Sequence, residues 1–168
     1  IFINCIIIYE KENFYKYKGG DTMQNLLLTR IDNRLIHGQV ATQWCSSIGA
    51  NLILVANDVV ADDKLRQGLM DMAAPAYAAT RYWTLDKTIS TIHKANAKQL
   101  IFLVCETPSD VLKLVEGGVP IKKVNIGNMH MAEGKRQVVG SVAVDDKDVQ
   151  AGLDIEAGHF TPDKEIRH

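Results

Sequence analysis

The fold of this chain is decided by the stretch LLLTRIDNRLIHGQV, residues 26–40. It begins as an apolar run, breaks into charged residues, and resumes as an apolar pattern at helical spacing from Val40 onward. A short buried strand, a loop and an amphipathic helix in this order are typical of the opening of a βαβ unit. Ligands of open α/β sheets bind beyond the carboxyl ends of the strands. We therefore expect Arg34 and His37, which follow the strand, to lie at a binding edge.

The residues around His37 favour the binding of a phosphoryl group. If a helix begins at about Gly38, the unpaired N–H groups of Gly38, Gln39 and Val40 point back toward the histidine, and the helix dipole adds partial positive charge. Such a position attracts phosphate and favours a neutral imidazole with a free lone pair, which a nucleophile needs. Arg34 supplies a planar, always charged guanidinium that matches phosphate oxygens. The pattern predicts that His37 takes up a phosphoryl group and passes it on without a metal ion.

A purely structural explanation of His37 stays open at this point. A single histidine beside a helix start is more often a packing or capping residue than a nucleophile. The presence of Arg34 three positions earlier favours the nucleophilic role of His37 only modestly. The residues alone leave both interpretations standing.

Length and composition bound the class of protein. The chain has 168 residues, which fits one domain with a single substantial core. Its formal net charge of -1, with mixed signs, argues against a role on nucleic acid or on a membrane surface. The three cysteines, Cys5, Cys45 and Cys105, are odd in number and lack metal-ligand spacing. This usage indicates a reducing cytosol, with Cys45 and Cys105 as core residues.

Five separated strings resemble one protein family, the IIB components of the mannose-type sugar phosphotransferase system (PTS). They are RIDNRLIHGQV at 30–40, VANDVVADD at 55–63, RYWTLDK at 81–87, LVCETPSDVLKLVEGGVP at 103–120 and VNIGNMH at 124–130. The resemblance runs from about residue 23 to 148, and it is specific because the strings agree in order.

This resemblance implies roles for the residues of the loop. His37 is expected to be the phosphorylated nucleophile, through Nδ1, and Arg34 to neutralise the phosphoryl charge. Asp32, Gly38 and Gln39 are the expected phosphate-binding set, with amides near 38 and 39 holding the phosphoryl oxygens and Asp32 orienting the loop.

The resemblance also implies an activity and partners. The expected protein is a phosphotransferase without a cofactor, cytoplasmic and peripheral to a membrane transporter. It would accept phosphate from a phosphohistidine of an A component and donate it to a sugar presented by membrane C and D components. The strings look most like the branch associated with N-acetylgalactosamine or galactosamine, while mannose, fructose and sorbose stay open. The sequence also leaves a homo-oligomer open.

Two other classes of function compete with this one. A regulatory module would hold a phosphate in the same loop and never transfer it. A phosphatase or hydrolase would use His37 as acid or base, but the sequence has no second carboxylate pair, cysteine nucleophile motif or metal cluster.

Three polar residues at the ends of later strands are candidates for the rim of the site. Asn57 follows an apolar run, although a turn or helix cap is the commoner role of such a residue. Asn128 and His130 follow another run, and His130 is the one other histidine that we expect near His37. A catalytic role for His130 is only weakly indicated.

The expected fold is an open, mostly parallel β-sheet with helices on both faces. Continuous apolar runs at 51–56 and 99–105 are typical of strands buried on both faces. We expect a helix at 62–74 with Leu65, Leu69, Met70 and Met72 inward. The other expected elements are helices at 38–48, from 84, from 108 and from about 145, and strands at 80–83, 122–127 and 137–144.

The two ends of the chain are unusual. Residues 1–18 are almost entirely Ile, Phe, Asn, Tyr and Lys, and 18–22 can be back-translated to a ribosome-binding sequence ahead of Met23. We therefore treat 1–22 as a non-native leader or upstream-translated segment outside the fold, and 23–168 as the IIB-like domain. From Gln150 the chain departs from the family pattern, which ends in a further strand. A missing edge strand, a truncated chain or an altered reading frame would explain this.

Overall fold

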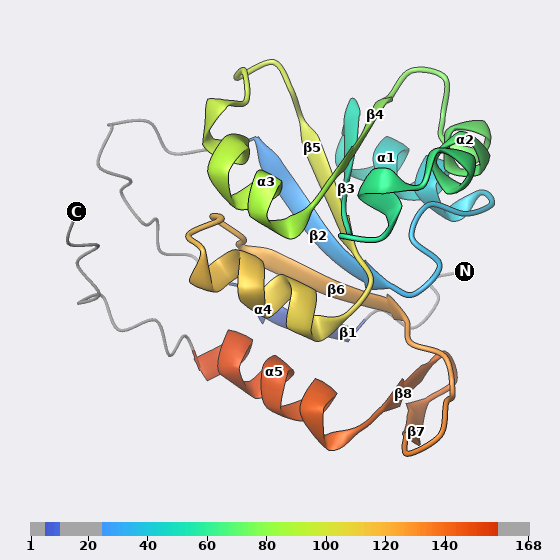
Figure 1. Cartoon of the computed structure of the whole chain (residues 1–168), viewed down its shortest axis with the longest axis vertical. Coiled ribbons are helices and arrows are strands. Elements are labelled where there is room, and N and C mark those ends of the chain that lie inside the picture. The colour runs from blue at the N-terminus through green and yellow to red at the C-terminus, as the bar shows by residue number, and fades with distance from the viewer. Residues whose placement is uncertain (1–5, 11–24, 158–168) are drawn as a thin grey trace.

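The computed structural model describes residues 6–10 and 25–157, and the side chains of 25–156 within them. Its main sheet has six strands in the order β1-β6-β2-β5-β3-β4. The last five run parallel, and β1 is antiparallel to β6. The elements in chain order are β1 Ile6–Glu10, β2 Leu26–Asp32, α1 Val40–Ile48, β3 Leu52–Ala56, the 3-10 turn η1 Val60–Asp62, α2 Lys64–Ala73, β4 Ala79–Trp83, α3 Leu85–Thr91, the 3-10 turn η2 Ile92–Lys94, β5 Ile101–Cys105, α4 Pro108–Glu116, β6 Lys123–Asn128, β7 Arg136–Val139, β8 Val142–Val144 and α5 Asp146–Ala157 (Figure 1).

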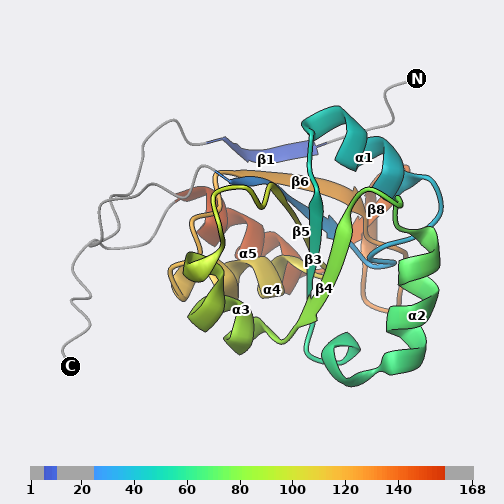
Figure 2. The same cartoon turned by 90° about the horizontal axis from the view of Figure 1, so that it is seen from above.

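Helices cover both faces of the sheet, as the alternating pattern predicts. Figure 2 shows α1 and α2 on one side of the sheet and α3, α4 and α5 on the other. Two separate clusters of buried side chains fill the two layers, one under each group of helices. Every residue of β3 and β5 is buried, which confirms that their continuous apolar runs mark strands covered on both faces.

Helix α1 is placed by residues at its two ends. It starts at Val40, two residues later than expected, with Gln39 as an N-cap that makes no side-chain hydrogen bond. It ends at Gly49, whose φ of 75° lies in the left-handed region that glycine enters at low cost. The helix therefore has no side-chain cap at its N-terminus and a glycine cap at its C-terminus.

The inward face expected for α2 is confirmed at Met70 and wrong at the other three positions. Leu65, Leu69 and Met72 are exposed, and the buried side chains are Gln67 and Met70. The Gln67 amide donates to the carbonyls of Val60 and Ala61 in the turn η1, so a polar residue takes the inward position. Satisfying those buried carbonyls sets the rotation of the helix, and the leucines are left outside.

Residues 137–144 form a hairpin and not the single expected strand. β7 and β8 pair antiparallel around Gly140 and Ser141. The Gln137 amide donates to the carbonyls of Val139 and Gly140, and the Ser141 hydroxyl donates to the carbonyl of Gly127. These bonds close the turn and tie the hairpin to β6. Helix α5 then begins at Asp146, close to the expected position.

The segment set aside as a leader contributes a strand. Ile6–Glu10 pairs with β6 at the edge of the sheet, so its exclusion from the fold is wrong for these five residues. A native start at Met23 stays a prediction. The unusual residues from 158 onward lie outside the described part of the chain.

Within 6–10 and 25–157, no helix is both long and apolar enough to span a membrane.

Candidate functional site

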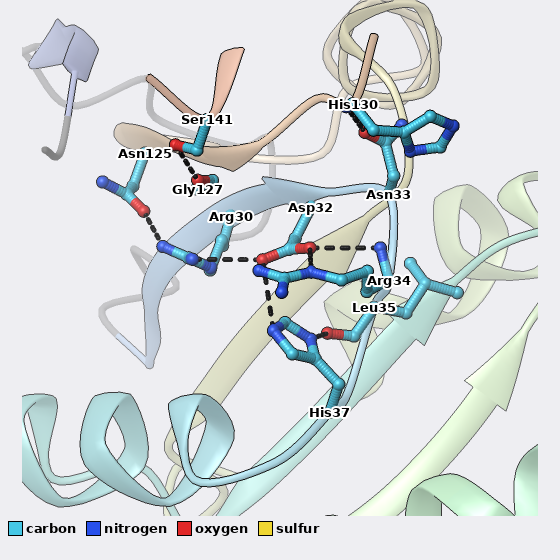
Figure 3. A network of polar contacts seen from close by, with 10 residues as sticks. All are labelled: Arg30, Asp32, Asn33, Arg34, Leu35, His37, Asn125, Gly127, His130 and Ser141. Atoms are coloured by element: carbon cyan, nitrogen blue, oxygen red, sulfur yellow. Dashed lines mark hydrogen bonds and ion pairs between the residues drawn. The ribbon is translucent and has the colours of Figure 1, made fainter. Parts of the chain in front are cut away.

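The loop between β2 and α1 lies at the carboxyl edge of the sheet, as expected. It is anchored there by the adjacent loop after β6, because the backbone N–H of Asn33 donates to the backbone carbonyl of Asn128 over 3.0 Å. In return the His130 backbone N–H donates to the Asn33 side-chain oxygen over 2.7 Å. These bonds bring the ends of two parallel strands together around one site (Figure 3).

Two apolar side chains fix the middle of this loop. Leu35 and Ile36 are each 4% exposed and pack into the core layer under α1 and α2. Leu35 has a φ of 58°, a left-handed conformation that is uncommon for a residue other than glycine. Burial of its side chain holds this conformation and leaves Arg34 and His37 on the outer side of the loop.

His37 lies in this loop with both ring nitrogens facing protein atoms. Its Nδ1 is 3.0 Å from the Leu35 carbonyl oxygen, which can only accept, so this nitrogen carries a proton in the arrangement seen. Its Nε2 is 4.0 Å from Oδ2 of Asp32 and is buried without a hydrogen-bond partner among the described residues. The imidazole side chain is 21% exposed. Nδ1 is therefore open to another group only if the ring turns away from the Leu35 carbonyl.

Asp32 is the centre of the polar contacts around His37. Its side chain is fully buried, and its Oδ1 accepts the Arg34 backbone N–H over 3.1 Å and the Arg34 Nε over 3.4 Å. Its Oδ2 accepts from Arg30 over 3.1 Å and faces the imidazole. A carboxylate repels phosphate, so within the expected phosphate-binding set this residue orients the loop (Figure 3).

Arg34 is the exposed cation of the site. Its side chain is 52% exposed, and its only ionic contact within the described residues is the long one to Asp32. Gly38 and Gln39 follow in the turn before α1, and Gly38 has a φ of 47°. Within the described part of the chain, the N–H groups of Gly38 and Gln39 have no protein acceptor. A guanidinium and two free amides are thus available to an anion beside His37.

The other rim candidates have structural contacts. Asn57 is 6% exposed, donates to Glu106 over 2.6 Å, and accepts the Val60 N–H over 2.9 Å, which is the turn role named as its alternative. The ring of His130 points away from the His37 ring, while its backbone braces Asn33 (Figure 3). The structure therefore does not bring a second imidazole to His37.

The neighbouring strand ends are acidic. Burial raises the pKa of Asp110, and the charges of Glu106 and Asp58 raise it further, while hydrogen bonds from Thr107 lower it. Negative charge at the ends of β3 and β5 disfavours a phosphate there. The cationic end of β2 is the part of this edge suited to a phosphoryl group.

Arg30, Asn125 and Gly127 belong to the same network, and the sequence analysis assigned them no role. Arg30 is 7% exposed and bonds both Asn125 and Asp32. The available signal was a pair of charged residues, Arg30 and Asp32, alternating with apolar ones in a strand, which places both on one face. Only the pairing of β2 with β6 shows which residues meet them.

Comparison with known proteins identifies the family. Residues 26–159 match the family described as "PTS system sorbose subfamily IIB component". The chain is 53% identical over 134 residues, 80% of its length and 85% of the relative's, to the N-acetylgalactosamine-specific phosphotransferase enzyme IIB component 2 of Escherichia coli K12. It is 37% identical to the fructose-specific EIIB component of Bacillus subtilis, covering 77% and 80% of the two chains. The crystal structure of the N-acetylgalactosamine-specific IIB component 1 from Escherichia coli matches with a TM-score of 0.76 at 52% identity, covering 80% of this chain and 89% of that one. The chain therefore belongs to the sorbose subfamily of PTS IIB components, which are phosphotransferases.

Proposed function

We propose that His37 is the residue that carries the phosphoryl group, received from a phosphohistidine of a IIA component and given to a sugar. The observation that carries this proposal is that His37 and the exposed guanidinium of Arg34 lie on one loop and face the two oxygens of the same buried carboxylate, Asp32. In such an arrangement the carboxylate orients the ring and the guanidinium is free to meet phosphate.

The transfer uses His37 Nδ1, and Asp32 assists it. When the ring leaves the Leu35 carbonyl, Nδ1 releases the proton that it carries there, and Nε2, which faces Asp32, takes one up. The Nδ1 lone pair is then free for attack. That lone pair attacks the donor's phosphorus, the donor's P–N bond breaks, and the donor imidazole recovers its lone pair. In the second transfer a sugar hydroxyl attacks the same phosphorus, the bond to Nδ1 breaks, and the hydroxyl proton is released. The ring first leaves the Leu35 carbonyl, 3.0 Å from Nδ1.

Arg34 neutralises the charge of the phosphoryl group. Its Nε contact with Asp32 is 3.4 Å long, so little is lost when the guanidinium exchanges the carboxylate for phosphate. The N–H groups of Gly38 and Gln39 hold the remaining oxygens, and Gly38 has no side chain to obstruct them. Positioning and charge neutralisation supply most of the catalysis in phosphoryl transfer.

The sugar that we propose is N-acetylgalactosamine or galactosamine. The support is the 53% identity with a relative named for N-acetylgalactosamine, against 37% with one named for fructose. Mannose, fructose and sorbose are the alternatives. The proposed partners are the IIA donor and the membrane IIC and IID components with bound sugar. This places the protein in the cytoplasm beside its transporter, a setting that suits its free, buried Cys45 and Cys105.

Mass spectrometry of the full chain tests this proposal. The protein is incubated with phosphoenolpyruvate, the general PTS phosphocarriers and a IIA component of the N-acetylgalactosamine system. We expect an acid-labile increase of about 80 daltons, the mass of one phosphoryl group. Membranes containing IIC and IID with N-acetylgalactosamine then remove the label, and mannose, fructose or sorbose removes it more slowly. No labelling by a competent donor would instead support a module that binds phosphate without transferring it.

A further inference from the structure

Arg30 occupies a position where arginine is uncommon. It lies in β2, between β5 and β6, and only 7% of it is exposed. Desolvating a guanidinium is costly, and replacing buried ionic groups by apolar residues of similar volume is often neutral or stabilising. Within the described residues, Arg30 Nε and Asn125 Nδ2 lack hydrogen-bond partners, so the network is not fully satisfied. Stability alone is a poor explanation for this arginine.

The guanidinium of Arg30 is held from several elements. One terminal nitrogen donates to Oδ1 of Asn125 in β6, and the group stands 5.3 Å from the centre of the Trp44 ring in α1. Gly127 in β6 leaves room for it, because a Cβ there would overlap Nη2 of Arg30. These contacts leave the guanidinium one orientation, with Nη2 directed at Asp32 (Figure 3).

This orientation determines how Asp32 meets His37. Arg30 donates to Oδ2, the same oxygen that lies 4.0 Å from Nε2 of the imidazole. The other oxygen accepts from Arg34. If Arg30 is removed, Arg34 is the only cation bonded to the carboxylate within the described residues, and the carboxylate is free to turn toward it. The carboxylate oxygen that lies 4.0 Å from Nε2 would then no longer face the imidazole, and a proton on Nε2 would lose its nearest negative charge.

We propose that Arg30 is a positioning residue for phosphoryl transfer, which holds the Asp32 carboxylate toward His37 Nε2 so that Nδ1 is the nucleophile. The proposal deepens the proposed function and rests on His37 as the phosphorylated residue. Arg30 itself contacts neither the phosphoryl group nor the partner proteins.

The first test is Arg30→Met, compared with wild type and with Arg136→Met as a matched control. Arg136 is an exposed arginine paired with Asp146. We expect Arg30→Met to fold, and to be phosphorylated by phospho-IIA on the order of 10- to 100-fold more slowly, by analogy with residues that orient metal-binding histidines. Arg30→Lys should not restore the rate, because an ammonium cannot bridge two acceptors in a fixed plane. Arg136→Met should match wild type.

The second test separates positioning from a purely structural role. The 15N signals of the His37 ring in the folded protein report which nitrogen carries the proton, so this ratio is read separately from any loss of folded protein. We expect Arg30→Met to lower the share of the Nε2-protonated tautomer. Gly127→Ala, which displaces the guanidinium without removing its charge, should shift both rate and tautomer in the same direction. Gly68→Ala is its control, because a Cβ there meets nothing within 4 Å.

The outcomes distinguish this proposal from the proposed function. If wild type is phosphorylated at His37 while Arg30→Met keeps both the rate and the tautomer ratio, the role of Arg30 is refuted and the phosphocarrier function stands. A slower rate with an unchanged tautomer ratio also contradicts the positioning role. If wild type takes no phosphate on His37, the proposed function itself fails.

Discussion

Two loops leave the same edge of the sheet and are built in opposite ways. The connection from β5 to α4 is short and closed by a capping box, in which Thr107 Oγ1 accepts the Asp110 N–H and Asp110 Oδ2 accepts the Thr107 N–H. The connection from β2 to α1 is longer, has Leu35 in a left-handed conformation, and reaches a helix whose N-cap makes no side-chain bond. One loop satisfies its own polar groups, and the other leaves them available.

The difference indicates where stability and function are separated in this molecule. A capped helix start stabilises the fold but leaves fewer donors for a ligand. The uncapped start of α1 keeps the N–H groups of Gly38 and Gln39 available, and the strained loop is held by buried Leu35 and Ile36. Changes in the loop between β5 and α4 should therefore affect stability, and changes in the loop between β2 and α1 should affect phosphoryl transfer.

The largest effect is expected for His37→Ala. Without an imidazole the protein should take up no phosphate from phospho-IIA, while its free energy of unfolding changes by about 0.5 kcal/mol, as is usual outside the core. Intact-mass spectrometry and denaturant unfolding measure the two quantities. A His37→Ala protein that still becomes labelled would place the site elsewhere.

Arg34→Ala should have the next largest effect on transfer. Losing the only exposed guanidinium of the loop should slow phosphorylation about 100-fold, the size of effect typical for removing one stabilising donor. Stability should change little, because the lost ionic contact is long and half exposed. Rapid-quench labelling with phospho-IIA measures the rate, and an unchanged rate would remove Arg34 from the mechanism.

Thr107→Ala should show the converse pattern. Loss of the cap bond to Asp110 should cost about 1 kcal/mol of unfolding free energy. Phosphorylation under native conditions should equal that of wild type. Urea denaturation and the same labelling assay test this together, and a large loss of transfer would show that the two loops are coupled.

The smallest effect is expected for Gln39→Asp, which gives α1 the cap that it lacks. The new carboxylate should accept an N–H of the first turn and raise stability by about 0.5 to 1 kcal/mol. It should also repel the phosphoryl group and slow transfer several-fold. Gln39→Ser adds a neutral cap, so a comparison of the two variants separates charge from capping. Faster transfer in Gln39→Asp would argue against free amides as phosphate ligands.

Much of the fold was predictable because its signals are local. The runs of β3 and β5 are apolar throughout, and Gly49 marks the end of α1. The position of the loop followed from the rule that parallel strands end at one edge. These features depend on burial and chain geometry within a few residues.

The features that escaped prediction depend on distant partners. Gln67 sets the rotation of α2 because its side chain donates to carbonyls of η1. The helical periodicity of the sequence does not show where those carbonyls lie. The hairpin of β7 and β8 depends on a turn closed by Gln137. Arg30 donates to Asn125 on the neighbouring strand, a residue that is 95 positions away in the sequence. Asn57 was named as a rim candidate because it follows a strand, and its contact with Glu106 is equally invisible in the sequence.

The most direct test of the account is to identify the phosphorylated nitrogen. The protein is labelled with 15N histidine, phosphorylated through phospho-IIA, and examined by a correlation between phosphorus and the ring nitrogens. We expect one phosphoryl group bonded to Nδ1 of His37, with the proton on Nε2 facing Asp32. A phosphoryl group on Nε2, or on any residue other than His37, would contradict the account.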